Sequence, residues 1–375
     1  LGTNVDISAN ANLTTVDNFS IDTDASVTMT IAQQDKISSA AGTETVTLSD
    51  LGTVVGNAAV ENYVLAAGAQ SLTLGASGQN VTLDGSGATG SVAISTGTLT
   101  SITGTLSDGT GDDTIALTLA TTGVDISAAT TTDVDSIALA SGISATMTVA
   151  QDVLITSAAG TNTVTLSDSG TVTGNAAVET YNLADGAGNV FTTDTVGQTV
   201  TGGTDDDTIT GSSGNDVISG GAGADTLTGG TGVDVLTGGD GIDTFVFGTS
   251  DSATTVYNDF NLSSSFNDGD QFNGDFDIIR DFVTGADRVD IDDTVTFFGN
   301  SDDELYVNST NKLEAMSNLP TGLALLISGE FNETTNKFTT DFVSGSDTLV
   351  YFNVDGTTQG VVLDNSILTS VADFI

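Results

Sequence analysis

Apolar and polar residues alternate along the first 200 residues of the chain. Stretches such as SVTMTIA, TVTLSD, NVTLDG and SVAIST place an apolar side chain at every second position, and Gly, Asn and Asp separate them. This period of two predicts short strands, each with one buried face. Two segments, AQQDKISSAA and AQDVLITSAA, leave helix and strand both open. We therefore predict an all-β fold for this part of the chain.

A long internal repeat divides these strands into two copies. The segment Ser39–Leu65 returns as Ser157–Leu183, at an offset of 118 residues. We take residues 1–123 as the first copy and residues 124–201 as the second. Short strands that run on without a linker predict an elongated β-solenoid, in which each rung is buried by its neighbours. Two β-sandwich modules in tandem are the alternative.

A shorter period of nine residues follows, from Gly202 to Val246. Its five units are GGTDDDTIT, GSSGNDVIS, GGAGADTLT, GGTGVDVLT and GGDGIDTFV. The sixth place is always aspartate and the eighth always apolar, which gives Asp207, Asp216, Asp225, Asp234 and Asp243, followed by Ile209, Ile218, Leu227, Leu236 and Phe245. Glycine accepts positive φ without steric cost, so the first six places predict a turn and the last three a strand.

Two such units make one coil, so strands eighteen residues apart stack at about 4.8 Å. This places Asp207, Asp225 and Asp243 in one file and Asp216 and Asp234 in the other. The segment holds no Lys, Arg or His, and carboxylates stacked this closely repel one another unless a cation neutralises them. Asp side chains and turn carbonyls supply the six to eight oxygens that calcium takes, and calcium suits such flexible cages better than magnesium. We predict calcium binding at these five aspartates.

The nonapeptides resemble the G-G-x-G-x-D-x-U-x repeats of RTX proteins. The resemblance implies a parallel β-roll over residues 202–246, export by type I secretion machinery, and a place outside or on the surface of a Gram-negative-type cell. Calcium is abundant outside cells, so folding would depend on export. A disordered Gly/Asp linker is the alternative, but a linker would not keep an apolar residue at every ninth place.

The composition changes after the repeats. Seventeen of the 21 Phe and Tyr residues lie from Phe245 onward. Large aromatic side chains predict a better-packed, β-rich cap over residues 247–375, which covers the last open rung. The segments DTFVFG and DIIRDFVTGADRVDI resemble the region that follows the repeats in serralysin-type and surface-layer proteins. That resemblance makes Asp281, Asp287, Asp341 and Asp347 candidate ligands, with ordinary hairpin turns as the alternative. The final SVADFI resembles a type I secretion signal.

Two further acidic features lie within the first copy. Residues Asp108–Ala116 read as a single partial nonapeptide, for which we predict an ordinary turn because it has no stacked partner. Glu61 returns as Glu179 in the second copy, and this periodic placement favours an outward strand position over a catalytic role.

Composition excludes several classes of function. The formal net charge is -45, from 50 acidic and 5 basic residues, which excludes nucleic-acid binding because that needs Lys and Arg. No apolar run is long enough to span a membrane. The chain lacks Cys and His, which excludes thiol and imidazole catalysis and the usual zinc sites. A glycosidase needs only two carboxylates and stays open by counting, but the chain has no Trp to stack on a sugar. We predict that the chain is not an enzyme.

The whole composition, rich in Thr, Ala, Gly, Val and Asp and free of Cys, resembles that of bacterial surface-layer proteins. We therefore predict a secreted, calcium-dependent structural protein that self-assembles into an extracellular layer or filament. Its partners are then other copies of itself, with cell-surface polysaccharide as a further candidate. An adhesin stalk, or the C-terminal export domain of a secreted hydrolase, are the alternatives.

Overall fold

The fold is described from a computed structural model. It describes residues 1–248 except 2–3, 11–12, 14–15, 41, 67–68, 84–90 and 108–113, and then 256–257, 271–273, 277–282, 287–291, 296–297, 323–332, 337–340, 346–354 and 357–364. Spatial contacts divide the chain into two units, Leu1–Ser167 and Asp168–Ile375. The predicted domain boundaries at 123/124, 201/202 and 246/247 stay predictions.

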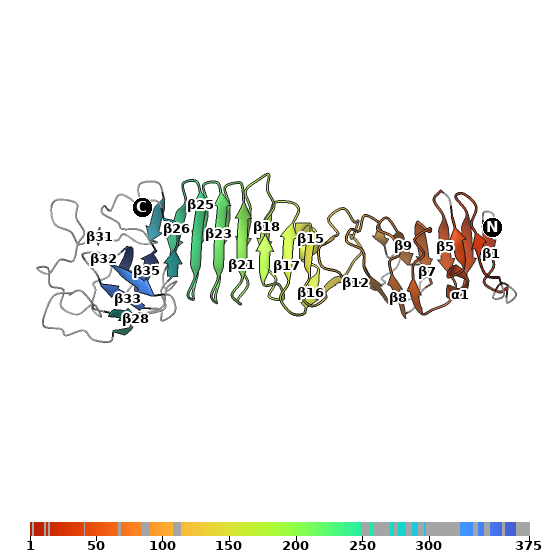
Figure 1. The fold of residues 1–375 in the computed structure, drawn as a ribbon, viewed down its shortest axis with the longest axis horizontal. Helices are drawn as coiled ribbons and strands as arrows, with labels where there is room; N and C mark the ends of the chain where they lie inside the picture. Colours follow the sequence, from red (N-terminus) through yellow and green to blue (C-terminus); the bar gives the residue numbers. More distant parts are fainter. Residues whose placement is uncertain are drawn as a thin grey trace, which may run out of the picture. The chain divides into compact units, whose positions relative to one another are not determined.

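The first unit is a solenoid of parallel strands (Figure 1). One wall consists of β1 (Val5–Asp6), β3 (Ser26–Met29), β5 (Thr45–Leu48), β7 (Asn62–Leu65), β9 (Asn80–Leu83) and β11 (Leu106–Ser107). A second consists of β6 (Thr53–Val55), β8 (Ala69–Thr73), β10 (Ser91–Ser95), β12 (Thr114–Leu119), β14 (Ser136–Leu139) and β16 (Ile155–Ala158). The unit also holds β13 (Val124–Asp125), β15 (Ser144–Met147) and β17 (Thr163–Leu166), which pair in that order, and the pair β2 (Phe19–Ser20) and β4 (Ile37–Ser39).

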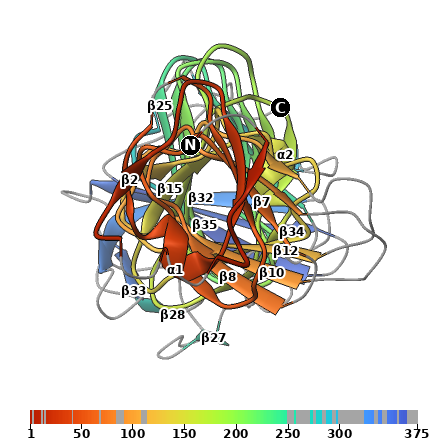
Figure 2. The same cartoon turned by 90° about the vertical axis from the view of Figure 1, so that its right-hand side faces the viewer.

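The predicted alternation determines which side chains fill the inside of each coil. In β3, for example, Val27 and Met29 are fully buried while Ser26 and Thr28 are half-exposed. Figure 2 gives the view down the axis along which the coils stack. The backbone runs around this axis, and the buried side chains fill the space inside each coil. Each strand pairs in parallel with one a full coil away, such as Thr45 with Asn62. The solenoid is therefore confirmed and the tandem sandwich, which needs antiparallel pairs, is wrong.

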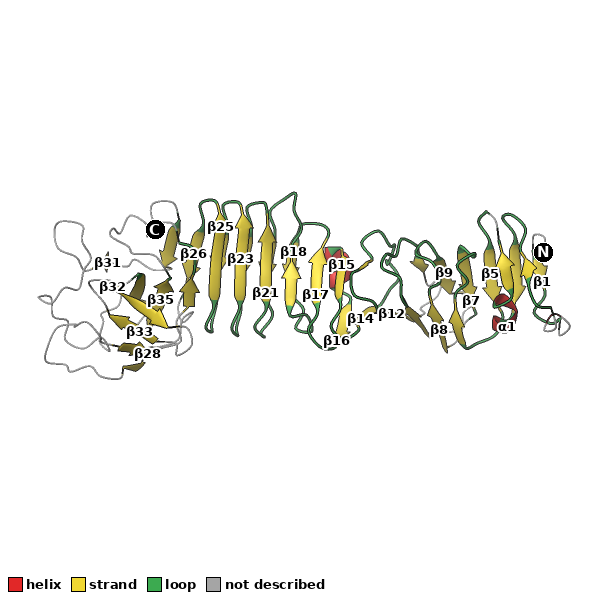
Figure 3. Ribbon diagram, viewed as in Figure 1, coloured by secondary structure: helices red, strands yellow, loops and turns green. Residues whose placement is uncertain are grey.

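The two segments left open contain both kinds of structure. Each overlaps a single helical turn, α1 (Ile31–Gln34) or α2 (Val149–Asp152), and continues into a strand, β4 or β16. The helical turns are red in Figure 3. A capping box forms the turn at α2: the Thr148 Oγ1 accepts from the Gln151 N–H at 3.2 Å, and the Thr148 N–H donates to Gln151 Oε1 at 2.9 Å. Four residues are too few for an amphipathic period to be visible in the sequence.

The second unit begins with two walls of short parallel strands. One consists of β18 (Thr171–Thr173), β20 (Val190–Thr192), β22 (Thr208–Thr210), β24 (Thr226–Thr228), β26 (Thr244–Phe247) and β30 (Arg288–Ile291). The other consists of β19 (Thr180–Asn182), β21 (Thr199–Gly203), β23 (Val217–Ala222), β25 (Val235–Asp240) and β29 (Asp277–Ile279). These coils carry the predicted β-roll.

A β-rich C-terminal part follows, as predicted from its aromatic content. β29 pairs in parallel with β35 (Thr357–Leu363), from which an antiparallel sheet continues. Its strands are β34 (Asp347–Val354), β32 (Leu323–Asn332), β33 (Lys337–Thr340), β28 (Gln271–Asn273) and β27 (Val256–Tyr257), and β31 (Thr296–Phe297) pairs with β32. At the join, the rings of Phe245 and Phe282 lie 6.1 Å apart.

Candidate metal centre

The nonapeptide strands stack with a constant offset of eighteen residues. Thr208 pairs with Thr226 and Thr226 with Thr244 on one wall, and Val217 pairs with Val235 on the other. The apolar residues of the eighth place all point inward and are fully buried: Ile209, Ile218, Leu227, Leu236 and Phe245. The predicted coil of two nonapeptides is therefore present, and it positions the aspartates of the sixth place at the corners.

The five aspartates form the two files that the spacing predicts. We call Asp207, Asp225 and Asp243 the first corner file, and Asp216 and Asp234 the second. Each carboxylate accepts a backbone N–H from the residue at the same place one coil earlier, and for Asp225, Asp234 and Asp243 that residue is an aspartate. The Asp207 N–H lies 2.8 Å from Asp225 Oδ1, the Asp225 N–H 3.0 Å from Asp243 Oδ1, and the Asp216 N–H 2.8 Å from Asp234 Oδ1. One oxygen of each side chain thus connects consecutive coils.

The other carboxylate oxygen in the first corner file has no such partner. The Oδ2 atoms of Asp207, Asp225 and Asp243 are buried and accept no hydrogen bond. In the second file, Asp216 Oδ2 accepts from the hydroxyl of Thr193 at 3.2 Å. A buried carboxylate oxygen without a partner costs free energy, because it has lost its water and gained nothing in return. These oxygens are the groups that a bound cation would satisfy.

The glycines of each turn leave room for these carboxylates. The Cα of Gly220, at the first place, lies against the carboxylate of Asp225, so any side chain there would collide with it. Gly221 and Gly223, at the second and fourth places, have φ of +110° and +135°, which other residues adopt only with strain. Ser212 and Asp205 occupy these places in other turns, and neither is among the described non-glycine residues with positive φ.

Burial of the corner carboxylates makes their charged forms costly. It raises the pKa of Asp225 to about 6, opposed by the N–H of Asp207 and reinforced by the charges of Asp243 and Asp207. Burial is also the main reason why the pKa values of Asp207, Asp216 and Asp243 are raised. Without a cation, the roll therefore favours protonation of these groups.

The donor set suits calcium. It consists of oxygens alone, since no Lys, Arg, His or Cys lies in residues 202–246. In the described part of the chain, no three Asp, Glu, His or Cys side chains gather closely enough to hold a metal ion by themselves. Each ion would therefore need backbone carbonyls of the turns beside the aspartates, and calcium accepts such mixed sets whereas zinc prefers nitrogen and sulfur.

Both corner files extend beyond the predicted five aspartates. Upstream, Asn189 and Gln198 stand one coil before Asp207 and Asp216 and donate their backbone N–H groups to these carboxylates, at 2.6 and 2.7 Å. The nine-residue register ADGAGNVFT and TDTVGQTVT at 184–201 was a signal for this extension. It is hard to recognise because amides replace the carboxylates. Downstream, the files continue into Asp287 and Asp277.

The hairpin alternative for Asp281 and Asp287 is wrong. β29 and β30, the strands on either side, do not pair with each other but lie on opposite walls, against β25 and β26. The chain therefore crosses the coil here as it does in the repeats. Asp347 begins β34, in the antiparallel sheet, outside both files. Asp341, residues 108–113 of the partial nonapeptide and the final SVADFI lie outside the described residues.

Glu61 and Glu179 lie at corners rather than on outward strand positions. Each directly precedes a strand, β7 or β19, and is half-exposed. Glu61 Oε2 accepts the N–H of Glu44 at 3.1 Å, so it joins two coils as the aspartates do. The reason is geometric: the last residue before a strand faces the corner of the preceding coil. No catalytic role follows from this position.

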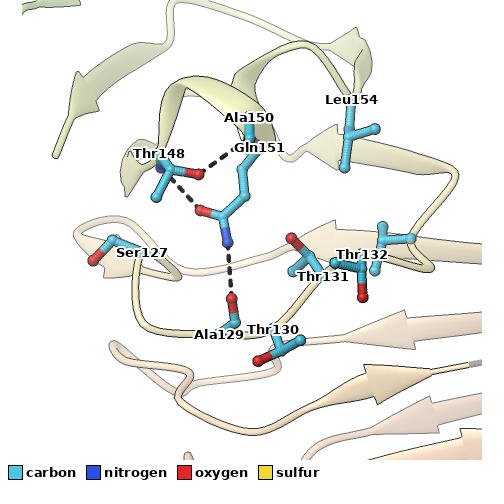
Figure 4. A pocket seen from close by; sticks show the side chains of 10 residues that line it. Ser127, Ala129, Thr130, Thr131, Thr132, Thr148, Ala150, Gln151 and Leu154 are labelled. Carbon is cyan, nitrogen blue, oxygen red and sulfur yellow. Dashed lines mark hydrogen bonds between the residues drawn. The ribbon is translucent and has the colours of Figure 1, made fainter. Parts of the chain in front are cut away.

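A cavity of about 380 Å³ lies beside α2 in the first unit (Figure 4). Its described lining consists of Ser and Thr residues, apolar residues and Gln151, with no titratable group. The Gln151 side chain is buried and donates to the carbonyls of Ile126 and Ala129, at 2.9 and 3.2 Å, and Figure 4 shows the second of these bonds. This amide is therefore used in joining coils.

Comparison with known proteins agrees with the geometry of the corner files. Residues 197–227 and 210–245 match the family model of the RTX calcium-binding nonapeptide repeat, four copies. Repeats of this family bind calcium, and the proteins that carry them are typically secreted by Gram-negative bacteria and linked to type I secretion. A comparison with curated proteins finds no match. Among the described helices, none is long and apolar enough to cross a membrane.

Proposed function

We propose that this RTX repeat protein is a non-catalytic scaffold that calcium orders outside the cell, and that copies of it assemble into a surface layer or filament. The observation that carries the proposal is the pair of corner files. Each aspartate connects two coils through one oxygen, and in the first file the other oxygen is buried without a hydrogen bond. Calcium binding at this position stabilises the stack of coils, because it neutralises charges that folding buries.

Calcium also bears on association between copies. A net charge of -45 makes copies repel one another at the distances that contact requires. Divalent cations on the acidic surface reduce this repulsion and bridge carboxylates of neighbouring molecules. Folding and assembly therefore depend on the same ion, and both are favoured once the protein has left the cell.

The test follows both processes in one titration. Calcium is added to chelator-treated protein while circular dichroism reports β-structure and light scattering reports assembly, with magnesium as the control ion. We expect a gain of β signal with rising scattering for calcium and neither for magnesium. A protein that gains β signal but stays monomeric at millimolar calcium overturns the assembly proposal and leaves calcium-dependent folding intact.

The cavity beside α2 favours a second candidate, an adhesin stalk. Its lining of Ser127, Thr130, Thr131, Thr132 and Thr148 offers hydroxyl groups suited to a neutral, hydroxyl-bearing ligand such as a saccharide. Saturable binding to a glycan array by calcium-loaded, monomeric protein, lost in Thr131→Val, would favour the adhesin. No binding to any glycan would leave the scaffold as the better proposal.

A further inference from the structure

Asp287 continues the first corner file one coil beyond the last nonapeptide. Its Oδ1 accepts the N–H of Asp243 at 3.1 Å, the bond that Asp243 itself accepts from Asp225 at 3.0 Å. β30 lies against β26 with Thr244 paired to Arg288 and Phe245 to Val289, so Asp287 stands directly before its strand as each nonapeptide aspartate does. Asp287 is 2% exposed, and Val289 is fully buried at the apolar place. Asp287 therefore occupies the sixth place of an additional rung.

Asp277 does the same in the second corner file. Its Oδ1 accepts the N–H of Asp234 at 2.9 Å, and Ile279 fills the apolar place in β29. The chain reaches these two rungs after offsets of 43 and 44 residues instead of eighteen. The sequence 282–290, FVTGADRVD, keeps only the fourth, sixth and eighth places of the nonapeptide. The match to the repeat family therefore ends at residue 245.

Two observations at the turn 238–243 indicate a ligand. Asp243 is 1% exposed, and its Oδ2 lies beside the Cα of Gly238 and accepts no hydrogen bond, as Asp225 Oδ2 does one coil earlier. The carboxylates of Asp287 and Asp281 lie close enough to Asp243 to raise its pKa, after the larger effect of burial. Three carboxylates thus approach one glycine turn.

Asp281 has a different part in this arrangement. Its two oxygens accept the N–H groups of Gly238 and Gly239, at 2.9 and 2.7 Å. These bonds fix the glycine turn next to Asp281, which precedes the strand of the added rung. Asp281 is therefore a positioning residue for the turn.

We propose that calcium binding continues past the nonapeptides, with a further calcium site at the turn 238–243 that uses the carboxylates of Asp243 and Asp287. This site rests on calcium binding by the repeats themselves. It makes the first rung of the C-terminal part a component of the calcium-bound roll, so calcium would stabilise the pairing of β30 with β26.

The test counts bound calcium in the full chain carrying Asp287→Asn. Asparagine keeps the hydrogen bond of the corner, as Asn189 shows by accepting the Gly170 N–H through Oδ1 at 3.4 Å, but it removes the charge. Asp17→Asn is the control, because Asp17 is exposed and lies in the first unit, outside both files and outside the turn 238–243. Equilibrium dialysis against calcium should give at least one ion fewer per chain for Asp287→Asn and an unchanged number for Asp17→Asn.

An unchanged number and affinity in Asp287→Asn overturns the added site, whereas a wild-type chain that binds no calcium overturns binding by the repeats. If the variant loses all its calcium, hydrogen exchange of the wild type decides. Calcium-dependent protection at 238–243 equal to that at 220–225 supports the site, and its absence at 238–243 alone overturns it.

Discussion

The solenoid of the first unit and the β-roll of the second use the same corner geometry with different chemistry. In the first unit, the Asn162 amide oxygen accepts the N–H of Ile143 at 3.0 Å. In the roll, the carboxylates of the corner files accept the equivalent bonds at 2.8 to 3.0 Å. An amide connects two coils and carries no charge, whereas a carboxylate connects them and brings a buried charge. The comparison teaches that a buried charge, and with it a place for a cation, arises from the residue type at the corner rather than from the coil itself.

The two regions also differ in how regular their coils are. The offset between paired residues in the first unit is 17 for Thr45 and Asn62 and 25 for Val81 and Leu106, but in the roll it is always eighteen. The irregular coils contain amide side chains that donate to backbone carbonyls of neighbouring coils, as Gln79 Nε2 does to Asn57 and Val60 at 2.7 and 2.9 Å. These bonds join neighbouring coils of the first unit without a buried charge.

Removal of calcium should give the largest difference between the two regions. With excess chelator, we expect the roll to unfold and the first unit to stay folded, because each occupied site contributes about 2.7 kcal/mol at a hundredfold excess over its dissociation constant. Hydrogen exchange read by mass spectrometry should show loss of protection at residues 202–246 and retained protection in β3, β5 and β7. Equal loss in both regions would contradict the contrast.

A methyl group at the first place of a turn should have the next largest effect. Gly220→Ala places its Cβ against the Asp225 carboxylate, whereas Gly78→Ala in the first unit meets only the Thr103 hydroxyl at 3.8 Å. We expect Gly220→Ala to destabilise the calcium-loaded roll by about 1–3 kcal/mol and to weaken calcium binding. Gly78→Ala should change neither. Thermal unfolding and calcium titration of both variants check this, and equal behaviour would be evidence against the carboxylate contact.

The pH dependence of calcium binding should separate the roll from ordinary exposed carboxylates. The pKa of Asp225 is raised to about 6, so the calcium-free roll holds a proton there below that pH. Calcium must displace this proton, and we expect the affinity of the roll for calcium to fall about tenfold per pH unit below pH 6 for each proton displaced. The same raised pKa also means that the free energy of unfolding of the calcium-free roll increases as the pH falls from 7 towards 4. Calcium titrations at pH 7.5, 6 and 5 measure the first effect, and affinity that is flat down to pH 5 would contradict it.

The smallest expected effect is in the first unit, where one glutamate, Glu44, stands at a place that an amide occupies in the second copy. The pKa of Glu61 is raised by burial and by the neighbouring carboxyl of Glu44, whose place in the second copy is taken by Asn162. A raised pKa means stability is lost as the pH rises from about 4.5 through the folded value. Glu44→Gln should reduce this loss, seen as a smaller difference in Tm between pH 5 and pH 8 with calcium present. Glu179→Gln, which lacks a carboxyl neighbour at that place, is the control and should change little.

The sequence predicts most of the roll and less of its surroundings. An aspartate and an apolar residue at every ninth place determine a turn and an inward side chain, so the files and their pairing could be derived from spacing alone. The join to Asp277 and Asp287 could not, because the offsets of 43 and 44 residues hide the register. Gln198 was also missed, since an amide in place of a carboxylate gives no charge signal. The helical turns α1 and α2 are too short for their pattern to be read.

The constant offset of eighteen residues also restricts how the roll can lengthen or shorten by gene duplication. Loss or gain of two nonapeptides, such as residues 211–228, would shorten or lengthen the stack by about 4.8 Å and return every later strand to its own wall. Loss of a single nonapeptide would instead exchange the two walls for everything downstream, so that the strand after Asp287 would meet the wrong partner. Variants of this protein should therefore differ in length by whole coils.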